Sequence, residues 1–198
     1  AASDVYKRQV YAAPQDAGGI GTVLGTAFFA IQIYCDFSGY TDIARGAARM
    51  MGIRLMENFR HPYRAVSIQD FWKRWHISLT CWFTDYVYIP LGGNQVTVPR
   101  HLLNLLIVWF LTGLWHGASW NFVAWGLFYG VILITEKYFT GKILAKLPGA
   151  VQTIYTMILV MLGWVLFFSP TLGSALTWIG NMFGQGATGF MDSQALYL

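Results

Sequence analysis

The sequence contains few charged residues for its length. Asp, Glu, Lys and Arg make up 11% of the 198 residues, whereas hydrophobic residues make up 56%. This balance leaves too little charge to cover the surface of a water-soluble domain. The sequence therefore predicts an all-α, polytopic membrane protein, because each helical membrane crossing needs about 20 predominantly apolar residues.

Cysteine is also scarce, and no cluster of metal ligands stands out. Cys35 and Cys81 both lie in or beside apolar segments, without metal-ligand spacing, so we expect no disulfide, no metal and no redox role. The absence of a His-Glu-x-x-His motif argues against a metal-dependent intramembrane hydrolase. No nucleic-acid-reading motif occurs either, and membrane topology explains the net charge of +4. Nucleic acid is therefore not an expected partner.

Three stretches without any charged residue predict the membrane crossings. Ala17–Cys35 forms one span, and Leu102–Thr135 is long enough for two short ones. In the third stretch, the sequence predicts a span over Val151–Phe168 and a further apolar helix over Leu172–Phe183, because Ser169 and Pro170 interrupt the pattern. We expect residues 1–16 to be a disordered start or a sequencing scar, and residues 17–198 to form a single membrane domain.

The first span is followed by Asp-Phe-Ser-Gly-Tyr-Thr-Asp at 36–42. Its Ser-Gly pair predicts a turn, after which Thr41 or Asp42 caps a short helix that ends at Gly52. Capping and ion pairing with Arg45 and Arg49 is favoured over a catalytic role for Asp36 and Asp42.

The stretch from Leu102 to Thr135 contains one imidazole, His116, within Thr-Gly-Leu-Trp-His-Gly-Ala-Ser-Trp at 112–120. Two spans, Leu102–Ala118 and Ser119–Thr135, are expected to meet near it. An ionisable side chain inside a membrane is costly unless it faces a polar cavity or has a partner, so it marks a functional site by default. A hydrogen bond to a backbone carbonyl in a helical hairpin is the structural alternative.

Basic residues are concentrated on either side of these two spans. Eight of the thirteen lie between Ala44 and Arg100, and Lys137, Lys142 and Lys146 follow the second span. A hairpin near His116 places both basic segments on one side, which the positive-inside rule assigns to the cytoplasm. These residues are therefore expected to contact lipid headgroups, although a coenzyme A phosphate or an acidic acyl carrier would also be attracted to them.

Within the first basic segment, Ser-Ile-Gln-Asp at 67–70 resembles a capping box and predicts a helix that continues to Leu79. Trp72, Trp75, His76 and Leu79 would share one face of it. Such a helix can lie along the membrane surface with its tryptophans at headgroup level, so interfacial anchoring is an alternative to a functional role for His76.

The remaining polar features have simpler interpretations. The aromatic segment from Cys81 to Gly93 is broken by proline and glycine, which favours a re-entrant segment over a span. His61 precedes Pro62 and is expected at the surface, while His101 opens a span and is expected at the membrane interface.

Five motifs occur in order along the chain. They are Asp-Phe-Ser-Gly-Tyr-Thr-Asp at 36–42, Glu-Asn-Phe-x-His-Pro-Tyr at 57–63, Phe-Trp-x-x-Trp-His-x-Ser-Leu at 71–79, Asp-Tyr-Val-Tyr-Ile-Pro-Leu-Gly-Gly at 85–93 and Gly-Leu-Trp-His-Gly-x-x-Trp at 113–120. Together they resemble the membrane-bound O-acyltransferase family and, within it, the alginate O-acetyltransferase branch. The resemblance covers Phe29 to Lys137, with weaker similarity towards the carboxyl end.

The resemblance implies a C-terminal fragment of a bacterial, multi-pass enzyme of the inner membrane whose helices surround a tunnel. Such an enzyme passes an acetyl group from a cytoplasmic thioester, acetyl-CoA or an acyl carrier, towards an exported or cell-surface polysaccharide, with no bound cofactor. Membrane lipids and extracytoplasmic acyltransferase proteins are the implied partners. Two alternatives remain: D-alanyl transfer to teichoic acid, the activity of another branch, and a transporter with a histidine-lined pathway.

The resemblance also implies roles for individual residues. His116 corresponds to the family's catalytic histidine, and His76 to a second functional one. A positioned neutral imidazole that removes a hydroxyl proton typically accelerates acyl transfer by about 10² to 10⁴, and burial favours the neutral form. The candidate substrate-binding residues are Trp75, Asp85, Trp115, Trp120 and Asp36.

Overall fold

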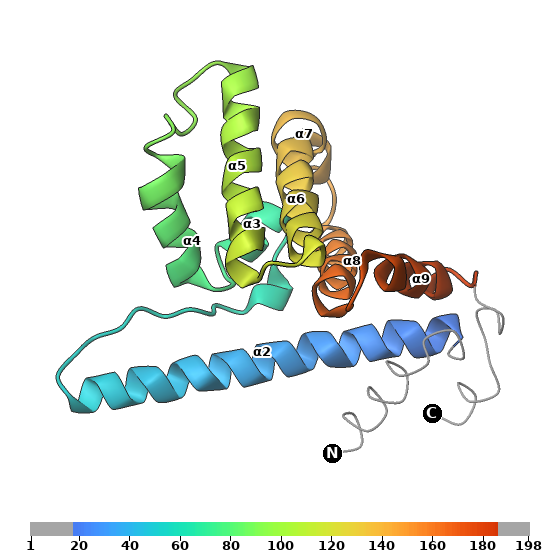
Figure 1. Cartoon of the computed structure of the whole chain (residues 1–198), viewed down its shortest axis with the longest axis horizontal. Helices are drawn as coiled ribbons and strands as arrows, with labels where there is room; N and C mark the ends of the chain where they lie inside the picture. The colour runs from blue at the N-terminus through green and yellow to red at the C-terminus, as the bar shows by residue number, and fades with distance from the viewer. Residues whose placement is uncertain (1–17, 186–198) are drawn as a thin grey trace. The chain divides into compact units, whose positions relative to one another are not determined.

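The computed structural model describes residues 18–185, so the start or scar expected at 1–16 lies outside the described residues. Within the described range every regular element is helical (Figure 1). In chain order the elements are α2 (Gly19–Met50), the 3-10 turn η2 (Pro62–Arg64), α3 (Ile68–Trp72), α4 (Ile77–Phe83), the π-helical turn η3 (Thr84–Tyr88), α5 (Val98–His116), α6 (Trp120–Thr135), the π-helical turn η4 (Glu136–Thr140), α7 (Gly141–Leu144), α8 (Gly149–Phe168) and α9 (Leu172–Met182).

The prediction of an all-α, polytopic membrane protein is confirmed. Four helical segments are long and apolar enough to cross a membrane: Gly19–Met50, Val98–His116, Trp120–Leu144 and Gly149–Phe168. The aromatic segment from Cys81 to Gly93 is not among them, in agreement with the prediction that it does not span. Helices α8 and α9 begin and end within two residues of the predicted bounds.

The chain divides into two compact units, which we describe separately. Among the described residues, one unit comprises residues 18–36 together with residues 161–185, and the other runs from Phe37 to Val160. Both candidate catalytic histidines belong to the second unit.

In the first unit, α9 packs on the end of α8 and the start of α2. Its N-terminus is fixed by a capping box between Thr171 and Ser174. Trp178 is 3% exposed, and its Nε1 donates a 2.9 Å hydrogen bond to Oγ1 of Thr26, a threonine buried within α2. A buried indole N–H in an apolar environment needs such a partner, so this bond fixes where α9 meets α2.

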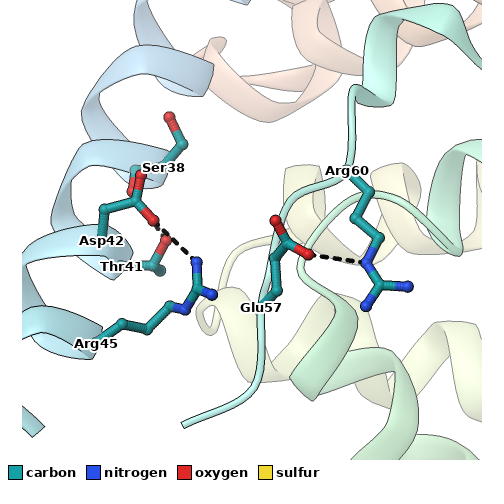
Figure 2. Close-up of polar contacts among 6 residues, drawn as sticks. All are labelled: Ser38, Thr41, Asp42, Arg45, Glu57 and Arg60. Carbon is teal, nitrogen blue, oxygen red and sulfur yellow. Dashed lines mark hydrogen bonds and ion pairs between the residues drawn. The ribbon is translucent and has the colours of Figure 1, made fainter. Parts of the chain in front are cut away.

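Helix α2 contradicts the prediction of a turn at residues 38–39, because it continues for 32 residues from Gly19 to Met50. Its polar side chains bond within the helix. Oγ1 of Thr41 donates to the carbonyl of Ser38 at 2.9 Å, and Arg45 pairs with Asp42 at 3.1 Å (Figure 2). Each partner lies one turn away on the helix surface, so these contacts leave the helical backbone bonds in place. The expected pairing of Asp42 with Arg45 is thereby confirmed.

The end of α2 agrees with the prediction. Gly52 has a φ of +78°, a conformation that glycine adopts without steric cost. The N–H of Ile53 then bonds back to the carbonyl of Ala48 at 2.9 Å. This closure stops the helix and starts the extended segment that leads to Asn58.

The single helix predicted over residues 67–79 is wrong. Ser67 does cap a helix, accepting a bond from the N–H of Asp70, but this helix, α3, ends at Trp72. The backbone at 74–77 pairs with residues 58–60 instead. Arg60 donates to the carbonyl of Arg74 at 3.0 Å, and Ile77 donates to that of Asn58 at 3.1 Å. Trp72 and Trp75 are 8% and 4% exposed, so they belong to the core of this unit and not to a membrane-surface face.

Helices α5 and α6 form the predicted hairpin, with the break at residues 117–119 (Figure 1). They approach closely because glycines face each other across the contact. A Cβ on Gly126 would overlap the carbonyl oxygen of Trp109, and one on Gly113 would overlap that of Phe122. Small residues that let two helix backbones meet are typical of membrane helix pairs.

Candidate functional site

His116 is the last residue of α5, at the point where the hairpin turns. The next residue, Gly117, has a φ of +154°, which is available essentially to glycine alone. A Cβ at this position would also meet the ring of Phe122 at 2.8 Å. The turn therefore requires glycine directly after His116, and it holds the half-buried imidazole at the helix end.

The ring of His116 packs edge-on against Trp125 of α6, with centroids 4.8 Å apart. Trp125 is 1% exposed and contacts Trp72 and Tyr129 in turn, at 5.6 and 5.4 Å. Contacts of this kind keep aromatic rings in defined orientations. One side of the imidazole is thus bounded by an aromatic core.

His76 lies at the start of α4, as the residue that precedes its first turn. Its backbone is left-handed (φ 46°, ψ 54°), and its side chain makes no capping bond to the helix. The half-buried imidazole packs instead against Phe37, with ring centroids 4.8 Å apart. Left-handed backbone is uncommon for a residue other than glycine and is found disproportionately at functional sites.

Trp115 connects the two histidines. Its ring centroid lies 4.9 Å from that of His116 and 5.9 Å from that of His76. Two histidines from motifs forty residues apart are therefore gathered around one indole.

Burial sets the protonation state of His76. Loss of hydration disfavours the imidazolium ion and lowers the pKa of His76 from 6.5 to about 4. At neutral pH this imidazole is therefore uncharged, with one nitrogen free to accept a proton and the other to donate a hydrogen bond. Such a pair of histidines suits proton transfer more than it suits the binding of an anion.

Comparison of the sequence with known proteins identifies its family. The family model of the membrane-bound O-acyltransferases matches residues 5–172. The chain belongs to the membrane-bound O-acyltransferase family. The resemblance inferred from the five motifs is confirmed.

Several members of the family are close relatives. Over 163 residues the chain is 43% identical to the probable alginate O-acetylase AlgI of Azotobacter vinelandii, covering 82% of this chain and 33% of that protein. It is 41% identical over 159 residues to the peptidoglycan O-acetyltransferase of Helicobacter pylori (79% and 30%), and 32% identical over 129 residues to the teichoic acid D-alanyltransferase of Bacillus subtilis (61% and 32%). The chain thus spans about a third of the length of these relatives.

The other predicted site residues of this O-acyltransferase chain lie in different surroundings. Trp115 is 57% exposed and Trp120 is 75% exposed, whereas Trp75 is buried against Phe59 with centroids 4.9 Å apart. Asp85 is exposed on η3. Asp36 is exposed on α2 and falls in the other compact unit. The structure therefore brings together His76, Trp115 and His116, and Trp75 lies against the same Phe37 ring as His76.

His101 lies in the first turn of α5, and its side chain is 2% exposed, so the protein surrounds it. Its location at the membrane interface stays a prediction. Its Nε2 lies 2.7 Å from the hydroxyl of Tyr88 and 3.3 Å from Nζ of Lys137, and its Nδ1 lies 2.7 Å from the hydroxyl of Tyr138. A lysine ammonium can only donate, so Nε2 is the acceptor and Nδ1 carries the proton. Burial, and then the neighbouring Tyr138, raises the pKa of Tyr88, which keeps its phenol protonated.

The contacts of Asn104 were also not predicted from the sequence. Asn104, one turn after His101, is fully buried and donates from Nδ2 to the carbonyls of Leu91 and Gly93 at 3.0 and 3.2 Å. Histidine and asparagine spaced i, i+3 in an apolar helix were the available signal. Together they attach the segment at 84–93 to the start of α5.

Proposed function

We propose that the full-length protein containing this chain is a membrane O-acetyltransferase. It moves an acetyl group from a cytoplasmic thioester across the inner membrane for O-acetylation of an exported or cell-surface polysaccharide. The observation that carries this proposal is the grouping of His76 and His116 around Trp115 in a chain of the membrane-bound O-acyltransferase family. Alginate and peptidoglycan are the acceptors named for two of its relatives.

The chemistry assigned to His116 is general-base catalysis. Its neutral imidazole takes the proton of an acceptor hydroxyl as the oxygen attacks the thioester carbonyl. The new C–O bond forms, the C–S bond breaks, and the departing thiolate receives the proton from the imidazolium. A general base of this kind typically contributes about 10² to 10⁴ in rate. His76, uncharged at neutral pH, supports this step from the other side of Trp115.

The direction of transfer follows from the charges. If α5 and α6 each cross the membrane, the basic segment before α5 and the lysines after α6 lie on the same side of the membrane. The positive-inside rule assigns that side to the cytoplasm. Basic residues there suit the phosphates of acetyl-CoA or an acidic acyl carrier. A tunnel through the bundle, and extracytoplasmic acyltransferase proteins that receive the acetyl group, complete the proposed route.

D-alanyl transfer to teichoic acid is the second candidate. The observation in its favour is the 32% identity to the teichoic acid D-alanyltransferase of Bacillus subtilis. The same base would serve, since both reactions move an acyl group from a thioester to a hydroxyl.

Complementation with the full-length protein tests the proposal. The protein is expressed in an alginate-producing strain without its alginate O-acetylase, in a strain without its peptidoglycan O-acetyltransferase, and in a strain without its teichoic acid D-alanyltransferase. Ester-linked acetate or D-alanine is then released by mild alkali and quantified. We expect acetate on a polysaccharide, and its loss in His116→Ala with normal membrane insertion. D-alanine in place of acetate would favour the second candidate, and no ester in any strain would reject both.

A further inference from the structure

The start of α4 is capped from outside the helix. His76 occupies the N-cap position but makes no side-chain bond to the helix. Asn58, 18 residues earlier in the chain, takes over this role. Its backbone carbonyl accepts from the N–H of Ile77 at 3.1 Å, and its Oδ1 accepts from the N–H of Ser78 at 3.0 Å. The first two free N–H groups of α4 are thereby satisfied.

A third bond tightens this arrangement. The hydroxyl of Ser78 donates to the same Oδ1 of Asn58 at 2.6 Å. Beside these bonds, Phe59 and Trp75 form an isolated antiparallel bridge, and both side chains are buried. Residues 58–60 are thus fixed against residues 74–78 on both sides of His76.

This contact has a consequence for the imidazole. An N-cap residue usually turns its side chain back to the helix N–H groups. Because Asn58 already satisfies these groups, the side chain of His76 is released from capping and packs between Phe37 and Trp115. A left-handed backbone is strained for a residue other than glycine, and the bonds that the following two residues make to Asn58 hold the His76 backbone in place.

We propose that Asn58 is a positioning residue for His76, and that its two oxygens hold the His76 backbone in the left-handed conformation that directs the imidazole towards Trp115 and His116. This inference rests on the proposed function for its effect on acetylation. The position of the His76 imidazole does not depend on the proposed function, because chemical labelling of His76 can be measured whether or not the protein transfers acetate.

The test uses the full-length protein with Asn58→Ala, Asn58→Asp and Ser78→Ala. Aspartate keeps an acceptor oxygen at the same reach, whereas alanine removes it. Asn94→Ala, at an exposed asparagine in the turn before α5, is the matched control. Two quantities are measured: ester-linked acetate on the polysaccharide per membrane-inserted protein, and the rate at which diethyl pyrocarbonate modifies His76, read by mass spectrometry. The exposed His61 is the internal reference for labelling.

Asn58→Ala is expected to lower acetylation by up to about 100-fold, because a displacement of a catalytic group by about 1 Å can reduce the rate by that factor. The same variant should label His76 several-fold faster, because the ring leaves its aromatic packing. Asn58→Asp should restore both values to within about threefold of the wild type, and Asn94→Ala should change neither. Rescue by aspartate separates positioning from a general loss of stability.

Three results would overturn the proposal. The first is an unchanged labelling rate of His76 in Asn58→Ala, and the second is an equal loss of acetylation in Asn58→Ala and Asn58→Asp. If Asn58→Ala is not inserted into the membrane, the third is an unchanged labelling rate of His76 in Ser78→Ala. If the wild-type protein transfers no acetate, the proposed function fails, and the labelling rates alone decide the role of Asn58. If His76→Ala retains full acetylation while Asn58→Ala still exposes the ring, the catalytic role of His76 is rejected and the positioning role stands.

Discussion

Oε1 of Glu136 accepts a hydrogen bond of 3.0 Å from the backbone N–H of Ile68, 68 residues earlier in the chain. Its other oxygen, Oε2, accepts from the N–H of Gln69 at 3.2 Å. The carboxylate is 7% exposed and satisfies the free N–H groups at the start of α3. A side chain at the end of α6 therefore fixes the short helix that leads into Trp75 and His76.

This contact predicts that Glu136→Ala destabilises the protein by about 2–3 kcal/mol, because two buried N–H groups lose a charged acceptor. Glu136→Gln keeps one acceptor oxygen and should cost less. The measurement is the thermal unfolding of the detergent-solubilised full-length protein. Glu57→Ala is the control: Glu57 pairs with Arg60 at 2.9 Å in an exposed position (Figure 2), and such pairs contribute about 0–1 kcal/mol. Equal effects of the two alanine variants would contradict the capping role.

The buried cluster around His101 gives a second prediction. His101→Phe keeps a ring of similar size but removes both nitrogens, so the hydroxyls of Tyr88 and Tyr138 lose their partner. We expect destabilisation of about 1–3 kcal/mol, measured by the same unfolding assay. Tyr88→Phe removes one bond only and should cost about 1 kcal/mol. An unfolding temperature unchanged in His101→Phe would show that the cluster adds nothing to stability.

The sequence was sufficient to predict those helices and turns that depend on local composition. The charge-free stretches predict α5, α6 and α8, because burying backbone in lipid requires a helix whatever its neighbours are. Gly117 likewise marks the hairpin turn beside His116. The two histidine motifs could be recognised for the same reason, since each lies within a few residues of sequence.

The break at His76 and the contacts of His101 involve residues distant in the chain, whereas the turn wrongly predicted at residues 38–39 is replaced by contacts one helical turn apart within α2. His76 fits a helical pattern with Trp72 and Trp75, but pairing of its flanking backbone with Asn58 and Arg60 breaks the helix there. The partners of His101, Tyr88 and Tyr138, lie 13 and 37 residues away in the chain, so the sequence does not show that these side chains meet. Periodicity describes one element at a time, so it cannot show which segment will satisfy the backbone of another.

The contact between α5 and α6 gives a third prediction. Gly126→Ala places a methyl group against the backbone carbonyl of Trp109, which cannot move without separating the helices. We expect destabilisation of at least about 1–3 kcal/mol, as for other overpacked sites. Gly130→Ala, one turn further along the same helix, is the matched control, because its Cβ would meet the Cβ of Trp109 at 3.1 Å and a shift of a few tenths of an ångström relieves it. Both variants are compared by thermal unfolding, and an equal effect would contradict the tight contact at Gly126.

The depressed pKa of His76 predicts how stability changes with pH. Its imidazole titrates near 6.5 in the unfolded chain and at about 4 in the folded protein. Between these values the unfolded state binds a proton that the folded state does not, so this contribution to stability is complete above about pH 6.5 and is lost as the pH falls towards 4. The unfolding temperature of the full-length protein should decline over this range, and His76→Asn should flatten the decline.

A matched control exists because His61 has nearly the same backbone conformation as His76, with φ of 48° and 46° respectively, but is exposed. Asparagine tolerates left-handed backbone, so the substitution introduces little strain at either position. His61→Asn should therefore leave the slope of unfolding temperature against pH unchanged. If both variants flatten the slope equally, or if neither does, then burial of His76 is not the source of the pH dependence.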